Sequence, residues 1–318
     1  MKLGKRIAIW IAASLMVLVV AAGLLFWMRP LAVLEWYSRQ ALTRAGLKKT
    51  AVETSLGRQV LWQGGSGPTL VLLHGAGDQA GSWAQVAPAL SREYRVLVLD
   101  LPGHGESGPT DKPITVGVIT QGVEEVLQQK TNGPVILVGN SLGAFVAMLY
   151  AHRHPLQVAR VIAVNGGAVR NDLKGLTLTP TNRDEAGKLF GAMRDPYAPA
   201  VPGWVLDDFI RRTRKGPLGQ LMANRKDFES YFLDGHLSEV SVPVDLLWGE
   251  ADRLVPVEYA ERMEKELPTS RLTRIPRCGH VPQVECPQTF LQALQKILLM
   301  PQAPVPQGKV VEGALKEQ

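Results

Sequence analysis

Residues 139–143 read Gly-Asn-Ser-Leu-Gly and have the spacing of a nucleophilic serine in the pattern G-x-S-x-G. They follow a short apolar run, 135–138, and precede a segment with helical character that extends to about His154. A turn this tight places Ser141 in strained backbone geometry that lifts its hydroxyl above the edge of a sheet. Glycine at both ends removes side chains where the strand and the helix nearly touch. The alternative is a glycine-rich turn with an ordinary serine; the flanking strand and helix favour the nucleophile.

Two backbone N–H groups are candidates for stabilising the negative charge that forms when such a serine attacks a carbonyl. Leu142 begins the helix, so its N–H has no helical partner and faces whatever Ser141 attacks. The second candidate is the N–H of Ala76, in the glycine-bracketed loop 74–78 that follows an apolar strand. We interpret His74, at the start of that loop, as a residue that shapes the loop rather than as a base.

An acid and a base follow the serine in the order Ser141, Asp252, His280, and each comes directly after a predicted strand. In a parallel sheet all strand ends of this kind lie along one edge, so residues far apart in sequence can meet there. Glu250 is a rival for the acid. We favour Asp252 because it lies deeper in its loop, whereas Glu250 lies nearer the strand. The three residues Ser141, Asp252 and His280 predict a mechanism in which His280 takes the proton of the serine while Asp252 orients the imidazole. Such a mechanism needs no metal or cofactor.

Four other polar residues in these loops are interpreted as structural. Asp100 and His104 follow a strand that precedes the serine strand, so we do not expect them to act as catalytic partners. Cys278 and Cys286 have neither metal-ligand spacing nor the pattern of a disulfide framework. A single bridge between them is conceivable in an oxidising compartment, but the sequence favours two buried thiols.

The charge of the chain is concentrated at its N-terminus. The 318 residues carry a formal net charge of +6, of which residues 1–49 contribute +7 from eight Lys or Arg and one Glu, so the rest sums to −1. A nucleic-acid-binding surface would need basic residues on the folded domain, so we expect no nucleic-acid partner. A basic segment next to an apolar span favours anionic lipid instead.

The N-terminal segment has the length of a membrane anchor. Residues 7–28, after a basic flank at 1–6, contain no charge, and as a helix they span about 33 Å, enough for a hydrocarbon core of about 30 Å. Trp10 and Trp27 lie near the two ends, where aromatic residues gather in membranes. A cleaved signal peptide is the alternative, but the apolar run continues beyond the possible cleavage site at 20–22.

The residues after the span predict a juxtamembrane helix at 29–50, which would hold the catalytic domain against the bilayer; a plain linker helix is the alternative. Basic residues flank the span on both sides and leave its orientation open. If the protein is bacterial, the short first flank favours a cytoplasmic N-terminus and an extracytoplasmic catalytic domain.

Strands and helices then alternate, which predicts a mainly parallel sheet covered on both faces. The first part of this core is expected at 51–169 and the second at 239–300, with a disordered tail at 301–318. Between the two parts, residues 170–238 have little strand character and predict a helical cap over the sheet edge. The cap and the neighbouring loops would form an apolar substrate pocket, for which the candidates are His74, Trp204, Phe209 and Val281. The basic run 211–215 is either a solvated face or a contact with anionic head groups.

These landmarks resemble the α/β-hydrolase superfamily over about residues 52–299. The resemblance rests on the motifs around Ser141, Asp252 and His280 and on His74-Gly75. The anchor, the segment Glu35-Trp36-Tyr37 and the basic helix resemble membrane-anchored monoacylglycerol-lipase-type serine hydrolases and related bacterial lipases and esterases.

The resemblance implies a doubly wound α/β fold with an inserted helical cap, here preceded by one transmembrane helix. It also implies an esterase or lipase that cleaves lipid-like or small esters through an acyl-enzyme and needs no obligate protein partner. Two alternatives remain open: a carbon–carbon bond hydrolase of the same fold, and an inactive binding module on a hydrolase scaffold.

Overall fold

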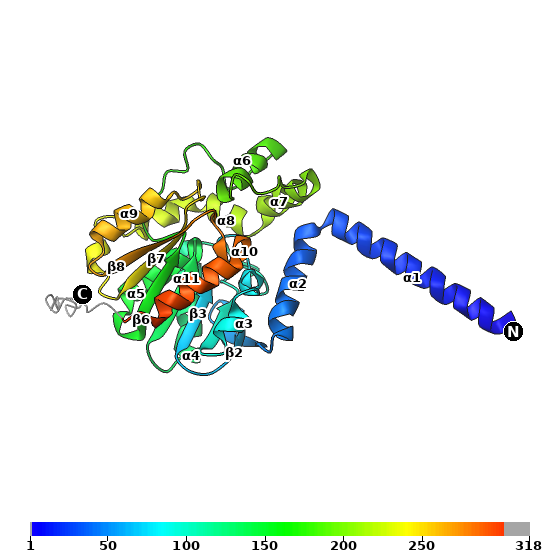
Figure 1. The fold of residues 1–318 in the computed structure, drawn as a ribbon, viewed down its shortest axis with the longest axis horizontal. Coiled ribbons are helices and arrows are strands. Elements are labelled where there is room, and N and C mark those ends of the chain that lie inside the picture. Colours follow the sequence, from blue (N-terminus) through cyan, green and yellow to red (C-terminus); the bar gives the residue numbers. More distant parts are fainter. Residues whose placement is uncertain (1, 302–318) are drawn as a thin grey trace.

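The computed structural model describes residues 2–301, and its centre is one eight-stranded sheet with the order β1-β2-β4-β3-β5-β6-β7-β8 (Figure 1). β2 pairs antiparallel with both β1 and β4, and all other neighbours are parallel. The carboxyl ends of the six parallel strands therefore lie along one edge. The strands are β1 Lys48–Thr54, β2 Gly57–Gly64, β3 Thr69–Leu73, β4 Arg95–Leu99, β5 Val135–Asn140, β6 Val158–Val164, β7 Val244–Gly249 and β8 Ser270–Ile275.

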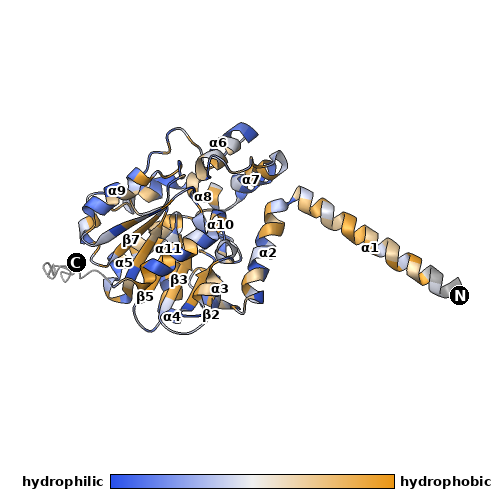
Figure 2. Ribbon diagram, viewed as in Figure 1, coloured by the Kyte–Doolittle hydropathy of each residue, from blue (hydrophilic) through white to orange (hydrophobic). Residues whose placement is uncertain are grey.

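The central strands are apolar at nearly every position because both faces of the sheet are buried. In β3, Val71 and Leu73 belong to the hydrophobic core on one face, whereas Leu70 and Leu72 belong to the core on the other. All four side chains have an exposed fraction of 0%. This alternation follows from the two-residue repeat of a strand, and Figure 2 shows the same concentration of hydrophobic residues in the sheet.

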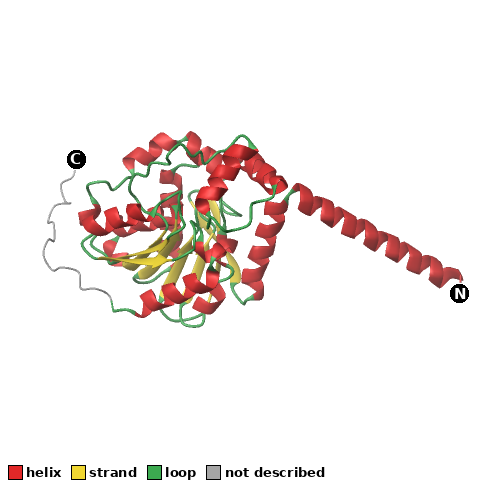
Figure 3. Ribbon diagram, turned by 45° about the horizontal axis from the view of Figure 1, so that its top comes forward, coloured by secondary structure: helices red, strands yellow, loops and turns green. Residues whose placement is uncertain are grey.

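Helices cover the two faces of the sheet (Figure 3). The first core contains buried residues of α4 (Val116–Lys130), α5 (Leu142–Arg153) and α9 (Val257–Glu266). The second contains buried residues of η1 (Ala80–Trp83), α3 (Ala87–Leu90) and α11 (Pro287–Leu299). Two short helices, η2 (Pro155–Gln157) and α10 (Pro282–Glu285), lie in connections. The predicted doubly wound α/β fold is confirmed.

The cap lies between β6 and β7 and is helical, as the sequence predicts. Between those two strands the structure has helices but no strand. Asn182 accepts a hydrogen bond from the N–H of Glu185 and so caps the first cap helix. The helices are α6 Arg183–Met193, α7 Gly203–Lys215, α8 Pro217–Ala223, η3 Arg225–Ser230 and η4 Leu237–Glu239.

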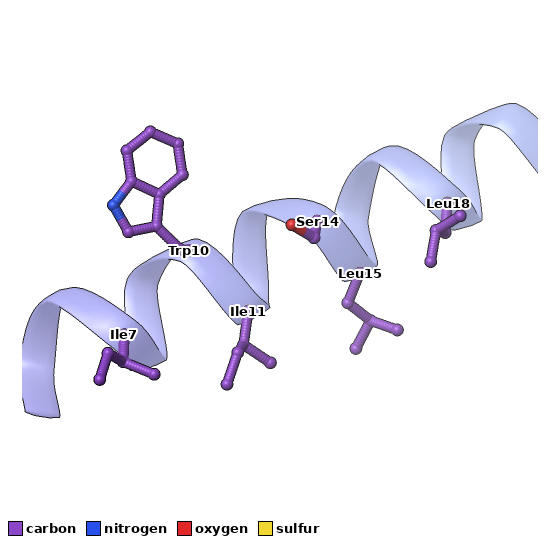
Figure 4. A pocket seen from close by; sticks show the side chains of 6 residues that line it. All are labelled: Ile7, Trp10, Ile11, Ser14, Leu15 and Leu18. Carbon is purple, nitrogen blue, oxygen red and sulfur yellow. The ribbon is translucent and has the colours of Figure 1, made fainter.

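The N-terminal helix α1 (Lys2–Met28) projects away from the sheet and its helices (Figure 1). Its residues 7–28 are all exposed, and the segment is long and apolar enough to cross a membrane. Figure 4 shows Trp10 on one side of this helix and Ile11 and Leu15 on the other. The shallow hollow between such side chains lies on the outside of the helix and is not an enclosed substrate pocket.

The segment predicted as one juxtamembrane helix at 29–50 is shorter than expected. Helix α2 covers Pro30–Arg44, and residues 48–50 already belong to β1. The helix ends because Gly46 adopts a left-handed conformation with φ of 91°, a common way to stop a helix. Leu42 of α2 is fully buried in the second hydrophobic core, so this helix is part of the catalytic domain and more than a surface segment. The predicted disordered tail at 301–318 falls, apart from Pro301, outside the described residues.

Candidate active site

Ser141 lies at the sharp turn between β5 and α5. Its φ of 54° and ψ of −114° are outside the regions that residues with a side chain normally adopt. The turn is possible because a side chain at Gly139 would overlap the backbone of Gly143, and one at Gly143 would overlap the carbonyl of Leu73. The backbone N–H of Ser141 donates to the carbonyl of Val164 at 2.9 Å. The strained conformation is therefore held by close packing on both sides.

Asp252 and His280 are hydrogen-bonded to each other. The Nδ1 atom of His280 is 2.7 Å from Oδ2 of Asp252, and both residues are 3% exposed. The carboxylate also accepts hydrogen bonds from the side-chain amide of Asn165 at 2.8 Å and from the N–H groups of Leu254 and Val255, each at 2.9 Å. These donors fix the position of the carboxylate beside the imidazole.

The structure thus brings Asp252, and not its rival Glu250, to His280. Glu250 comes directly after β7 and is exposed, although its backbone N–H donates to Ile275. Asp252 lies two residues further on, where the loop turns back under the imidazole. A carboxylate in that position orients the ring and can stabilise the imidazolium that forms during proton transfer.

Asn140 ties the histidine loop to the serine turn. Its side-chain amide donates to the backbone carbonyl of His280 at 2.8 Å, and its Oδ1 accepts from Nε2 of Gln283 at 3.2 Å. From the other side, the N–H of His280 donates to the carbonyl of Met193 at the end of α6. Asn140 directly precedes Ser141, so these bonds hold the loop of residue 280 next to the serine turn. The sequence analysis named neither Asn140 nor Gln283 as a site residue. Asn140 could have been found, because it occupies the variable position directly before the serine in the G-x-S-x-G pattern.

The two predicted oxyanion donors belong to segments that adjoin the serine, one in sequence and one in space. A side chain at Gly75 would come within 3.4 Å of the Cβ atom of Ser141, so the loop that carries Ala76 contacts the serine turn directly. Within residues 2–301, the N–H groups of Ala76 and Leu142 are not engaged in hydrogen bonds outside regular helices and strands. The cap covers this loop, because a side chain at Gly77 would lie 3.1 Å from Leu218 of α8.

His74 shapes its loop, in agreement with one expectation from the sequence. The other expectation, that it lines the substrate pocket, is corrected. Its Nδ1 donates to the carbonyl of Gly75 at 2.8 Å, and its Nε2 accepts the N–H of Leu101 at 2.9 Å. Burial, and then the neighbouring His104, hold the pKa of His74 well below its ordinary value. A fully buried ring with both nitrogens engaged inside the fold has no group left to offer a substrate.

Asp100 and His104 also support the loops rather than the chemistry. The carboxylate of Asp100 accepts the N–H groups of Ala80 and Glu106 at 2.7 and 2.8 Å, and burial raises its pKa to about 6. Burial lowers the pKa of His104 from 6.5 to about 4. His104 packs against His74 with ring centroids 5.3 Å apart.

The low pKa of His104 predicts a pH-dependent loss of stability. Between pH 6.5 and 4 the unfolded chain binds a proton at His104 that the folded chain does not, so acidification favours unfolding. Against a His104→Phe variant, the wild type should therefore lose up to about 1.4 kcal/mol of unfolding free energy per pH unit in this window. Urea unfolding of the full chain in detergent at pH 7.5, 6 and 5 measures the difference. A difference that stays constant with pH would contradict a low pKa at His104.

Two of the aromatic pocket candidates are engaged elsewhere. Trp204 packs edge-on against Phe26 of α1, with centroids 5.3 Å apart, and Phe209 packs against Phe190 of α6 at 4.9 Å. Because α7 is amphipathic and lies between α6 and the N-terminal helices, its aromatic residues face those neighbours. Val281 is half-buried next to His280 and stays a candidate.

A different aromatic cluster begins on the helix that follows the serine. Phe145 is one helical turn after Ser141 on α5, and its ring packs edge-on against Phe228 at 5.5 Å and Phe232 at 5.6 Å. Ala76 belongs to the partly buried residues that pack on the same core. The sequence indicated Phe228 and Phe232 only as members of the apolar cap, because their distance to Ser141 depends on how the cap folds back.

The prediction of two free thiols is wrong. Cys278 and Cys286 form a disulfide, with their Cα atoms 6.0 Å apart. The chain between them contains His280 and the short helix α10, which turns Cys286 back toward Cys278. Glu285 supports the same loop, since its carboxylate accepts the N–H groups of Gly279 at 2.6 Å and Asp195 at 2.8 Å. The two cysteines are eight positions apart, and this spacing alone does not indicate that the chain turns back on itself between them.

Residues 70–293 match the family model described as the alpha/beta hydrolase family. This chain belongs to the alpha/beta hydrolase family. The match covers strands β4 to β8 and all but the first residue of β3, the cap, and the three loops that carry Ser141, Asp252 and His280. The hydrolase fold predicted from the motifs is therefore confirmed.

Relatives of this hydrolase have more than one named activity. It is 29% identical to a pimeloyl-[acyl-carrier protein] methyl ester esterase of Nitrosomonas europaea, over 73% of this chain and 96% of the relative. It is 27% identical to a 2-hydroxy-6-oxononadienedioate/2-hydroxy-6-oxononatrienedioate hydrolase of Cupriavidus pinatubonensis, over 79% and 95%. The crystal structure of a membrane phospholipase A, described as a bacterial virulence factor, matches with a TM-score of 0.73 and 28% identity, over 91% of this chain and 97% of the other.

Proposed function

We propose that this hydrolase is a membrane-anchored serine hydrolase that cleaves carboxylic esters of lipid-like or other apolar substrates. The observation that carries the proposal is the hydrogen bond of 2.7 Å between His280 and Asp252, in a loop that Asn140 ties to the strained turn of Ser141. A buried acid–imidazole pair next to a serine in this conformation is the arrangement that activates a hydroxyl for attack on a carbonyl.

In the proposed mechanism, Nε2 of His280 takes the hydroxyl proton of Ser141 as its oxygen attacks the ester carbonyl. The N–H groups of Ala76 and Leu142 stabilise the resulting oxyanion, each by about 3 kcal/mol. His280 then gives the proton to the leaving alcohol, which leaves an acyl group on Ser141. Water, deprotonated by His280, attacks this acyl-enzyme and releases the acid, while Asp252 holds the imidazole in place throughout.

The surroundings of the serine support an apolar acyl group. The cluster of Phe145, Phe228 and Phe232 is aromatic and begins one helical turn from Ser141, and the guanidinium of Arg170 lies over the outer ring, that of Phe232. The apolar helix α1 would keep the enzyme at a source of lipid esters, and the similarity to a membrane phospholipase A over most of both chains agrees with this placement.

A carbon–carbon bond hydrolase is the second candidate, because several relatives have that kind of name. The substrates in those names are dicarboxylates, which call for cationic groups near the serine. The cation over this cluster, Arg170, is paired with Glu229, so the aromatic cluster favours the ester. A membrane anchor also brings no advantage for a soluble dicarboxylate.

The disulfide supports an extracytoplasmic catalytic domain, the side that the short basic flank favours. Disulfides persist in oxidising compartments and are rare in the cytosol, and Cys278 and Cys286 are bridged. We therefore propose that α1 anchors the hydrolase with its catalytic domain outside the cytoplasm. Protease added to intact bacterial spheroplasts that express the full chain should digest the catalytic domain; protection until lysis would contradict this orientation.

The direct test of the proposed function is turnover and covalent labelling of the full chain in detergent. We expect a fluorophosphonate probe to label Ser141, and p-nitrophenyl and glycerol esters from C2 to C16 to be hydrolysed. A dienoic keto acid of the kind cleaved by carbon–carbon hydrolases is measured in parallel. Labelling with cleavage of the keto acid alone would select the second candidate, and absence of both labelling and turnover would select an inactive binding module.

A further inference from the structure

Helix α2 connects the N-terminal helix to three different parts of the catalytic domain. Along its length it contacts in turn the cap helix α7, the segment η1 that follows the candidate oxyanion loop, and the core beneath the sheet. Figure 1 shows α2 between α1 and the remainder of the domain. A helix that only tethered the domain to α1 would need none of these contacts. Each contact is therefore evidence for a further role of α2.

The first contact is a helix cap supplied by another helix. Arg29, at the N-cap position of α2, makes no side-chain capping bond; instead, the N–H of Leu31 donates to the carboxylate of Asp208 on α7 at 3.1 Å. Asp208 is fully buried, and its other oxygen accepts from Arg211, which also donates to the carbonyl of Met28 at the end of α1. An acidic group at a helix N-terminus is favourable for both the free N–H groups and the helix dipole.

The second contact is an ion pair one turn further along α2. Glu35 accepts from Arg212 of α7 at 2.5 Å, and both side chains are partly buried. Glu35 thus joins α2 to the cap near the end of the helix that begins beside α1. The pair is less exposed than a second ion pair on α7, between Arg183 and Asp207, whose side chains are 62% and 41% exposed.

The third contact reaches the candidate oxyanion loop. The hydroxyl of Ser38 accepts from the side-chain amide of Gln79 at 3.2 Å, and Gln79 also accepts the N–H of Gly81 at 2.7 Å. Gln79 immediately follows loop 74–78, which carries Ala76. A side chain at Gly81 would overlap the Ser38 hydroxyl, so α2 lies directly against this turn. The contact is close enough for a shift of α2 to move the turn.

The base of α2 is fixed in the core. Leu42 is fully buried, and the hydroxyl of Thr43 accepts from the indole N–H of Trp62 on β2 at 3.2 Å. The helix therefore has a fixed end at the sheet and three polar contacts above it, one beside the oxyanion loop and two to the cap.

We infer that α2 is a positioning element for catalysis, in which Glu35 and Ser38 hold the cap and the candidate oxyanion loop in one fixed relation. The inference rests on the proposed function for its effect on turnover. It assigns the residues that follow the anchor a role in the active site beyond attachment. A displacement of about 1 Å in the oxyanion loop is enough to reduce turnover by about a hundredfold, so a change at α2 is expected to be felt at Ser141.

The first measurement does not depend on catalysis. Hydrogen exchange of the full chain in detergent is compared for wild type, Ser38→Ala, Glu35→Arg and the control Arg183→Glu, which breaks the exposed ion pair within the cap. In Glu35→Arg we expect faster exchange in both α7 and residues 74–83, and in Ser38→Ala chiefly in residues 74–83. Arg183→Glu should affect the cap alone. Changes confined to α2 itself in the first two variants would overturn the inference.

The second measurement separates positioning from stability. With the concentration of active enzyme set by fluorophosphonate labelling, Glu35→Arg and Arg212→Glu should each lower kcat for a short soluble ester by about tenfold or more, while Arg183→Glu stays within about twofold. The double variant Glu35→Arg/Arg212→Glu restores the ion pair and should recover most of the loss. Unchanged kcat in the single variants, or no recovery in the double variant, would overturn the inference. Absence of turnover in the wild type would contradict the proposed function alone, and the exchange data would still decide the role of α2.

Discussion

Replacing Ser141 by alanine is expected to lower kcat for ester hydrolysis by about 10⁴–10⁶-fold. The variant loses the only hydroxyl that the serine turn presents and cannot form an acyl-enzyme. The Asp252–His280 pair and the candidate oxyanion donors stay in place, so a small residual rate from these groups is expected. Steady-state hydrolysis of a p-nitrophenyl ester by the purified full chain measures the loss.

The fold of the Ser141→Ala variant should be unchanged, which makes the comparison clean. Alanine and serine both have a Cβ atom, so the strained φ of 54° costs about the same in each. Ser230→Ala is a matched control, because Ser230 is exposed on η3 and its hydroxyl only donates to the carbonyl of Asp227. A loss of less than tenfold in Ser141→Ala, or an equal loss in both variants, would remove Ser141 as the nucleophile.

Replacing Asp252 by asparagine is expected to lower kcat by about 10⁴-fold. An amide can keep the hydrogen bonds from Leu254 and Val255 through its oxygen and loses only the one from Asn165, so the loop should hold its shape. Toward His280 it would present an N–H in place of a carboxylate oxygen. The imidazole would then carry its proton on Nε2 and could not accept the proton of Ser141.

Glu250→Gln is the control that separates the two acids. Glu250 is exposed and lies in the same loop, so loss of its charge should change kcat by less than about twofold, as for other surface substitutions. Similar melting temperatures for both variants and wild type would show that the loop is intact. A large loss in Glu250→Gln with little effect in Asp252→Asn would reverse the assignment of the acid.

The two predictions test different links of the proposed mechanism. Ser141→Ala removes the group that forms the covalent bond, whereas Asp252→Asn leaves that group and changes only the state of the base. A fluorophosphonate probe should therefore fail to label the first variant and label the second slowly.

Many features of this fold can be predicted from sequence patterns alone. The strands 69–73 and 95–99, the serine turn and the helical character of the cap follow from apolar runs, glycine positions and turn residues, which act over a few neighbouring residues. The length and composition of residues 7–28 likewise predict an apolar helix without knowledge of any other part of the chain. These features are local, so the sequence is sufficient for them.

Other features were decided only by the tertiary structure. The choice of Asp252 over Glu250, the disulfide between Cys278 and Cys286, and the engagement of both nitrogens of His74 all depend on the path of loops. The places of Trp204 and Phe209 depend on which neighbours α7 meets, and the burial of Leu42 depends on the docking of α2 against the sheet. Sequence periodicity specifies which side of an element is apolar, but not which distant element will cover it. That pairing is set by the packing of the whole chain, and it is the packing that brings the loop of His280, the cap and α2 to the loops around Ser141.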